Sequence, residues 1–189
     1  MKEKLLDQAK REYSAKQRFL ALLIMAPIFL LILPLILVWL GVRIDASFGW
    51  APTLPKPLNG ILGLLLMVFG WGLAIWSIYS QFTIGRGTPV PIMATQKLIV
   101  QPPFTYCRNP MALGAITMYL GTALLYRSLG AVMLVLLGAV LLFTYIKIFE
   151  EKEMVLRFGQ EYLEYKQQTP FLIPRFRSRP ADGHGKPVE

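Results

Sequence analysis

Cysteine, histidine and charge are all scarce in this sequence of 189 residues. The single cysteine, Cys107, cannot form a disulfide within the chain. The single histidine, His184, lies near the end of the chain, so no histidine-based metal site or hydrolase triad can form in the apolar part. Only 16% of the residues are charged, 54% are hydrophobic, and the mean hydropathy is +0.48. This composition excludes an ordinary water-facing surface and predicts an integral membrane protein without a metal site.

Four apolar runs without any charge account for this composition. They cover residues 19–42, 57–84, 111–126 and 129–146. A helix needs about 20 residues to cross the hydrocarbon core of a bilayer. The third run has only 16 residues, and Arg127 and Ser128 alone separate it from the fourth, which predicts an antiparallel helical hairpin. Pro27 and Pro34 interrupt the first run, but neighbouring helices can satisfy the freed backbone groups in a membrane. The predicted fold is an all-α membrane protein with four transmembrane helices.

Lysine and arginine lie mainly on one side of these four spans. Of the 20 in the chain, 17 fall in the amino-terminal arm, in residues 85–110 or after residue 146, and three fall on the other side. The positive-inside rule therefore predicts a multi-pass protein with both termini in the cytoplasm. The net charge of +9 then indicates orientation and contact with anionic lipid headgroups. It does not indicate nucleic-acid binding, because no basic run is interleaved with stacking aromatic residues.

The candidate polar groups gather in one part of the chain, which divides it into three segments. Residues 1–84 contain the amino-terminal arm and two scaffold spans without a buried ionisable group. Residues 85–174 contain a proline-rich loop expected to be ordered and cytoplasmic, the hairpin, and a helix whose apolar residues recur at helical spacing, as an amphipathic interfacial helix requires. Residues 175–189 form a basic tail that we expect to be flexible. Gly63, Gly70 and Gly72 in the second span favour close helix packing over a ligand border.

Glu150 and Glu151 directly follow the last apolar run, with Lys147 one turn earlier. One interpretation is an ion pair on a single helix face at the membrane interface, and the other is a site for a polar ligand. The loop similarly fits either a rigid lid or a ligand-holding segment. Its Arg108 fits either a membrane anchor or a group that binds an anion. Local chemistry leaves these alternatives open.

Two stretches together resemble the isoprenylcysteine carboxyl methyltransferases and the related membrane phospholipid methyltransferases. The pattern of that family is a Leu-Val pair, a Gly-x-Tyr turn and Arg-His-Pro-x-Tyr-x-Gly. After a hairpin it continues with Glu-Glu-x-x-Leu and Phe-Gly-x-x-Tyr-x-x-Tyr. The corresponding stretches here read QKLIVQPPFTYCRNPMALG and EEKEMVLRFGQEYLEYKQQTP. The resemblance spans about 90 residues, and two motifs in the right order are more specific than either alone.

The resemblance implies an enzyme that transfers a methyl group in line from S-adenosylmethionine to a lipid-like or small hydrophobic acceptor in the bilayer. The implied cofactor-binding residues come from the loop, the start of the third span and the glutamate pair. They are Gln96, Lys97, Leu98, Ile99, Phe104, Asn109, Pro110, Met111, Ala112, Glu150 and Glu151. The expected catalytic residues are Arg108 and Asn109, of which Arg108 binds an anionic group of the cofactor or acceptor. Lys147 is the expected substrate-binding residue.

The chain also departs from the family pattern. Asn109 replaces the usual histidine and cannot take a proton near neutral pH, which excludes imidazole base catalysis at this position. Ala112 replaces a tyrosine. Ile146 replaces an arginine that handles the acceptor's carboxylate, and only the adjacent Lys147 can substitute for it. Two alternatives therefore stay open: an NADPH-dependent membrane reductase of the sterol reductase type, and a membrane scaffold that has lost its site.

Overall fold

The computed structural model describes residues 13–52, 54–88 and 95–174, which form helices and no strand. The predicted tail, residues 175–189 with His184, lies outside the described residues, as does most of the amino-terminal arm. In chain order the elements are α2 (Ala15–Pro27), η1 (Ile28–Ile32), α3 (Leu33–Phe48), α4 (Lys56–Thr83), α5 (Pro110–Leu125), α6 (Leu129–Tyr145), η3 (Ile146–Glu150) and α7 (Glu151–Gln168). The all-helical class that the sequence predicts is confirmed for these residues.

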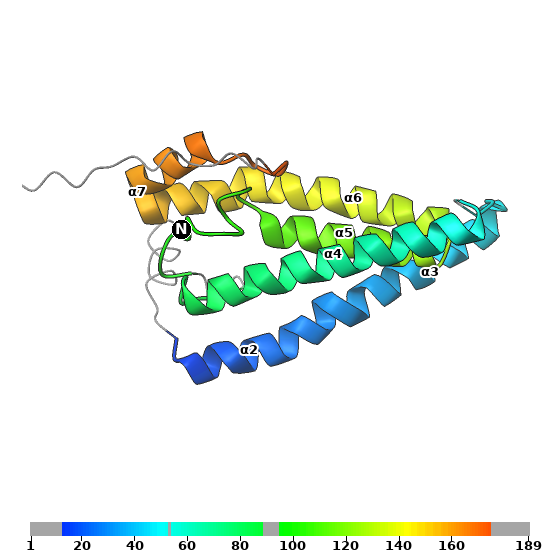
Figure 1. Ribbon diagram of the computed structural model, residues 1–189, viewed down its shortest axis with the longest axis horizontal. Helices are drawn as coiled ribbons and strands as arrows, with labels where there is room; N and C mark the ends of the chain where they lie inside the picture. Colours follow the sequence, from blue (N-terminus) through cyan, green and yellow to red (C-terminus); the bar gives the residue numbers. More distant parts are fainter. Residues whose placement is uncertain (1–12, 53, 89–94, 175–189) are drawn as a thin grey trace, which may run out of the picture.

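The helices run beside one another along the long axis of the molecule (Figure 1). At one end, short connections join α3 to α4 and α5 to α6, and we call this the hairpin end. At the other, called the loop end, lie the segment between α4 and α5 and the helix α7. The predicted antiparallel hairpin of α5 and α6 is therefore present. Residues from three separate parts of the sequence meet at the loop end.

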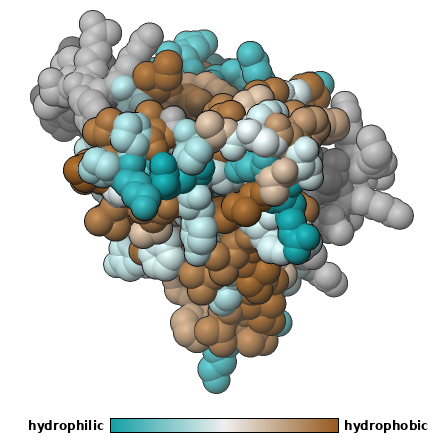
Figure 2. Space-filling model, turned by 90° about the vertical axis from the view of Figure 1, so that its right-hand side faces the viewer, coloured by the Kyte–Doolittle hydropathy of each residue, from teal (hydrophilic) through white to brown (hydrophobic). Residues whose placement is uncertain are grey.

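Three of the described helices are long and apolar enough to cross a membrane. They are Ala15–Phe48, Lys56–Thr83 and Leu129–Gln168. α5 is apolar but has only 16 residues, or roughly 24 Å at about 1.5 Å per residue, against a hydrocarbon core of about 30 Å. The fourth span therefore stays a prediction. Many large hydrophobic side chains of α2, α3, α4 and α6 are exposed. Figure 2 shows the molecule from the hairpin end. The lower part of this view is mostly hydrophobic, and most polar residues lie above it. Such an apolar surface is expected of a membrane protein.

The first long helix is continuous through both of its prolines. It begins at a capping box in which Ser14 and Gln17 exchange hydrogen bonds. Within η1 the helix widens, and Leu33 donates its backbone N–H to the carbonyl of Ile28, five residues earlier. The next residue, Pro34, has no N–H to donate in the same way to the carbonyl of Phe29. The hydroxyl of Tyr119 in α5 donates to that carbonyl at 2.6 Å, so a neighbouring helix satisfies the group that the proline leaves free.

Close contacts between backbones hold α4 against α5. A Cβ atom on Gly70 would lie 2.4 Å from the backbone nitrogen of Met118, and one on Gly121 would lie 2.4 Å from that of Met67. Gly63 and Gly114 lie in the same contact, whereas a Cβ on Gly72 would meet no atom within 4 Å. Close helix packing is thus present at Gly63 and Gly70, but the described part of the chain gives Gly72 no such partner.

At the loop end, α6 continues through η3 into α7. The direction of α7 changes sharply at Gly159, whose φ of 54° and ψ of −128° are non-helical. This conformation matches the first central residue of a type II′ turn, which glycine adopts without steric cost. The second part of α7 consequently turns back toward the bundle and buries Tyr162 and Tyr165 there. A helix is present where the sequence predicts one, while its place at a membrane interface stays a prediction.

Candidate active site

A cavity of about 150 Å³ lies at the loop end, where residues from α4, the α4–α5 segment, η3 and α7 meet. Its lining combines apolar side chains with a small set of polar ones. The apolar lining residues are Leu98, Ile99, Phe104, Ile146, Met154, Tyr162 and Tyr165. The polar ones are Gln81, Thr95, Arg108, Asn109, Glu150 and Glu151. Apolar walls with a few convergent polar groups are typical of small-molecule sites.

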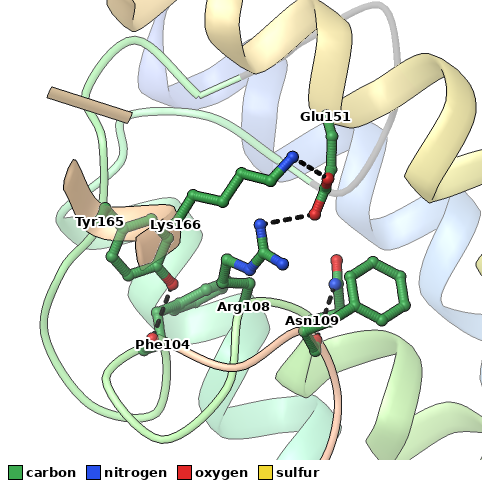
Figure 3. Close-up of polar contacts among 7 residues, drawn as sticks. Phe104, Arg108, Asn109, Glu151, Tyr165 and Lys166 are labelled. Atoms are coloured by element: carbon green, nitrogen blue, oxygen red, sulfur yellow. Dashed lines mark hydrogen bonds and ion pairs between the residues drawn. The ribbon is translucent and has the colours of Figure 1, made fainter. Parts of the chain in front are cut away.

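Glu151 is held between two cations. Its Oε1 lies 2.6 Å from Nη1 of Arg108, an ion-pair contact whose angles are not those of a hydrogen bond. Its Oε2 accepts a hydrogen bond from Nζ of Lys166 at 2.7 Å. The side chains of Arg108 and Glu151 are only 10% and 7% exposed, so water screens this pair weakly. Figure 3 shows Lys166 and Arg108 each contacting a different oxygen of the Glu151 carboxylate. The charge of Glu151 is therefore already compensated.

Glu150, one residue earlier, also lines the cavity but has a different environment. Among the described residues, no cation lies within ion-pair distance of its carboxylate, and none donates a hydrogen bond to it. The predicted neighbour Lys147 is exposed, and the structure pairs Glu151 with Arg108 and Lys166 instead. Local helix spacing suggests Lys147, but the fold brings two more distant cations to Glu151 and none to Glu150. The cavity thus contains one compensated carboxylate and one without a partner.

Residues 169–174, which we call the strap, run back across the loop from the end of α7. The backbone N–H of Arg108 donates to the carbonyl of Pro170 at 2.9 Å, and the side-chain amide of Asn109 donates to that of Phe171 at 2.9 Å. The guanidinium of Arg108 lies over the ring of Phe171, 5.6 Å from its centroid. The strap therefore fixes both Arg108 and Asn109, and the asparagine amide supplies one of the contacts.

The loop is held to α7 at two further points. The hydroxyl of Tyr165 donates to the carbonyl of Phe104 at 2.7 Å (Figure 3). Arg157 donates to the carbonyl of Thr95 and pairs with Glu153. Both Thr95 and Phe104 line the cavity. The loop is therefore held by both parts of α7, by Arg157 before the turn at Gly159 and by Tyr165 after it.

Cys107 is 1% exposed and adjacent to Arg108. Burial raises the pKa of its thiol above the ordinary value, and the backbone N–H of Asn109 offsets this only in part. A raised pKa keeps the thiol protonated and unreactive at neutral pH. Cys107 acts as a small apolar residue beneath the site.

The structure brings many of the predicted site residues together. Seven line the cavity: Leu98, Ile99, Phe104, Arg108, Asn109, Glu150 and Glu151. The other six are not among its lining residues: Gln96, Lys97, Pro110, Met111, Ala112 and Lys147. Pro110, Met111 and Ala112 form the first turn of α5, next to Asn109. Gln96 donates its backbone N–H to the carbonyl of Gly85, which anchors the loop to the end of α4.

Several lining residues had no predicted role in the site. Met154 belongs only to the predicted last helix, Tyr162 and Tyr165 only to that helix and the Phe-Gly-x-x-Tyr-x-x-Tyr motif, and Ile146 appears only as the replacement of an arginine. Gln81 and Thr95 carry no sequence signal of a site, because a polar residue at the end of an apolar helix or in a loop is common. Lys166 is recognisable only once the bend at Gly159 is known.

Residues 58–161, more than half of the chain, match the model of the family described as phospholipid methyltransferase. The chain belongs to this family. The match confirms the resemblance that the two motifs carry, and it favours a methyltransferase over a membrane reductase. No curated protein matches the chain. The matched region of the phospholipid methyltransferase family includes Arg108, Glu150 and Glu151 but ends before Tyr162 and the strap.

Proposed function

We propose that the protein is an integral membrane methyltransferase that uses S-adenosylmethionine and acts on a lipid-like or small hydrophobic acceptor. Membership of a methyltransferase family and the apolar helices support the class of enzyme. The unpaired carboxylate of Glu150, in the same cavity as Arg108, is the observation that carries the choice of cofactor. The amino-acid part of the cofactor is a zwitterion, and a carboxylate and a guanidinium are the groups that bind its two charges.

The residues present fit this cofactor in charge and polarity. Glu150 can accept hydrogen bonds from an ammonium or a ribose hydroxyl, and Nε of Arg108 is buried without a partner among the described residues. Leu98, Ile99 and Phe104 provide apolar surface for a base. The cavity is smaller than the 300–1,000 Å³ that is usual for small-molecule sites, so we expect it to widen on binding. The first turn of α5 and the loop residues Gln96 and Lys97 would then reach the cofactor.

The cofactor supplies a methyl group on a sulfonium, which is already an excellent leaving group. The protein needs chiefly to align the acceptor with that methyl group and to exclude water. We propose that Arg108 holds an anionic group and that Asn109, fixed by the strap, hydrogen-bonds the reacting partners without transferring a proton. Lys147 is exposed where η3 leaves the bundle, and we propose that it contacts the polar part of the acceptor.

We also propose that the loop end faces the cytoplasm, because 17 of the 20 lysines and arginines are on that side of the four predicted spans. The same residues would contact anionic lipid headgroups. The exposed Lys97 reports on this orientation. In sealed vesicles of known orientation, an impermeant amine reagent should modify Lys97 only from the cytoplasmic face, and modification from the other face would reverse the assignment.

Calorimetric titration with S-adenosylmethionine and S-adenosylhomocysteine tests the proposal in detergent or nanodiscs. We expect saturable binding by the native protein and a loss of at least about tenfold in Glu150→Gln, because an interaction with a charged group contributes about 1.5–3 kcal/mol. Glu161→Gln is the matched control, since it removes the same charge from an exposed position of α7. Equal binding by folded Glu150→Gln would refute the role of Glu150. Binding of NADPH instead would favour a reductase, and binding of none of them a scaffold.

A further inference from the structure

Gln81, in the last turn of α4, is a polar residue of the cavity that the family resemblance does not assign. Its side-chain oxygen is buried and forms no hydrogen bond within the described part of the chain. A buried acceptor without a donor costs about 1–3 kcal/mol, so such groups call for an explanation. Because Gln81 lines the cavity, a bound ligand can supply the donor.

The neighbouring polar side chains of α4 have partners. Ser77 and Thr83 each donate to a carbonyl of the preceding turn at 2.7 Å, and Ser80 donates to the carbonyl of Pro102 at 3.4 Å. This end of α4 can therefore satisfy hydroxyl groups with its own backbone or with the loop. Gln81 differs because it lines the cavity and its buried oxygen has no donor among the described residues.

The unpaired groups of the cavity fall into two kinds. The oxygen of Gln81 is a buried acceptor without a donor, and no ion pair or hydrogen bond from the described residues reaches the half-buried carboxylate of Glu150. Nε of Arg108 is a buried donor without an acceptor. Glu151 adds no free charge, because Arg108 and Lys166 already contact it. A ligand that satisfies all three groups must carry both N–H donors and an anionic group. An ammonium is the donor best suited to a carboxylate and an amide oxygen together.

We propose that Gln81 and Glu150 together bind the ammonium group of a zwitterionic ligand, whose anionic group lies at Arg108. The ammonium belongs either to the amino-acid part of the methyl donor or to a primary-amine headgroup of the acceptor. This inference rests on the proposed function and deepens it, since it assigns Gln81 as a binding residue and names the chemistry that it recognises. The two sources of the ammonium make different predictions.

Gln81→Met is the direct test, because it keeps the length of the side chain and removes its hydrogen-bonding groups. If the ammonium is that of the donor, this variant should bind S-adenosylhomocysteine about tenfold more weakly. It should bind 5′-methylthioadenosine, which lacks the amino-acid part, as the native protein does. Gln81→Glu retains an acceptor and should bind S-adenosylhomocysteine at least as tightly as the native protein. Gln160→Leu, at an exposed position of α7, is the control.

If the ammonium is that of the acceptor, Gln81→Met should leave S-adenosylhomocysteine binding unchanged. The native protein should then prefer vesicles of a phospholipid with a primary-amine headgroup over vesicles of the same lipid with a quaternary ammonium, and Gln81→Met should lose that preference. This second arm does not require the methyl donor to bind. A native protein that binds no donor but shows the preference would contradict the proposed function and retain the role of Gln81.

Thermal unfolding separates binding from a structural role. Removal of a buried unpaired oxygen should leave the unfolding temperature of the ligand-free Gln81→Met protein unchanged or raised. A lowered unfolding temperature, with equal loss of S-adenosylhomocysteine and 5′-methylthioadenosine binding, would mean that Gln81 only supports the fold. The proposal would also be overturned if the folded variant matched the native protein with every ligand and vesicle.

Discussion

The contact between α4 and α5 and the contacts at the loop end are built from different kinds of atoms. Between α4 and α5, glycines let two backbones approach so closely that no Cβ fits at Gly70 or Gly121. At the loop end, hydrogen bonds and ion pairs join side chains to segments far away in the sequence, such as Asn109 to Phe171 and Tyr165 to Phe104. The glycine contacts between α4 and α5 depend on how closely the two backbones fit together. The contacts at the loop end depend on each polar group having a partner.

This difference suggests that the two parts respond differently to change. In a lipid environment the helices gain little from the hydrophobic effect, so close packing has to stabilise the bundle. The polar contacts at the loop end instead fix the positions of a few side chains around the cavity. We therefore expect substitutions at the glycine contacts of the bundle to prevent folding. Substitutions at the loop end should alter the site while the bundle remains folded.

The largest effect is expected for Gly70→Leu. A side chain at this position would meet the backbone of α5, with its Cβ 2.4 Å from a backbone nitrogen, so α4 and α5 could not pack as they do. We expect little or no monodisperse protein in gel filtration from detergent. Gly72→Leu is the matched control on the same helix, because a Cβ there meets no atom within 4 Å, and it should change stability by less than about 0.5 kcal/mol. Equal yields from the two variants would argue against this contact.

Glu151→Gln should have an intermediate effect that is confined to the loop end. The variant keeps the shape of the side chain but leaves the buried guanidinium of Arg108 without its counter-charge. Breaking a buried pair in this way costs about 3–5 kcal/mol, and we expect the lower value because Lys166 is partly exposed and can turn to water. Hydrogen exchange should accelerate at the backbone amide of Arg108, which the strap protects, but not in α5.

Lys166→Gln is the companion variant for this test. Its side chain is 40% exposed, so loss of its contact with Glu151 should cost less than about 1 kcal/mol. If Glu151→Gln and Lys166→Gln lower the free energy of unfolding equally, the contact between Arg108 and Glu151 contributes nothing beyond that of Lys166. Acceleration of exchange throughout the bundle in Glu151→Gln would contradict the separation of the two parts.

The sequence predicts the apolar helices better than it predicts the contacts of the site. The runs that end near Tyr126 and Ile146 have no charge, and the two-residue joint between them leaves little choice but a hairpin. Helical geometry also explains the difference between Gly70 and Gly72, because two residues lie about 200° apart around a helix. The pattern of small residues alone does not reveal which of them faces a partner.

The cations beside Glu151 could not be predicted because both come from distant parts of the fold, Arg108 from the loop and Lys166 from beyond a turn in α7. Helix spacing connects Glu150 and Glu151 only to nearby positions such as Lys147. The turn at Gly159 brings Lys166 back to Glu151. The motif marks this glycine but does not state its φ and ψ angles. The role proposed for Gln81 could not be predicted either, since nothing in the sequence shows which polar side chain at a helix end will lack a partner.

A smaller effect than that of Glu151→Gln is expected within the bundle, where a packing contact and a polar contact occur together. The hydroxyl of Tyr119 donates to the carbonyl of Phe29, the group that Pro34 leaves without a partner, so one polar contact supports the packing of the first helix. Tyr119→Phe should lower the free energy of unfolding by about 0.6–1.7 kcal/mol, as for other hydrogen bonds between membrane helices. Tyr126→Phe, at an exposed position, is the control.

A double-mutant cycle shows whether the proline is the reason for this hydrogen bond. Pro34→Ala restores a backbone N–H that can reach the carbonyl of Phe29, so Tyr119→Phe should cost less in that background than in the native protein. The unfolding of all four proteins in detergent measures this coupling. Independent costs would mean that the carbonyl of Phe29 does not depend on Tyr119. The distinction between packing contacts and polar contacts would then be complete, since the bundle would need no polar contact at this break.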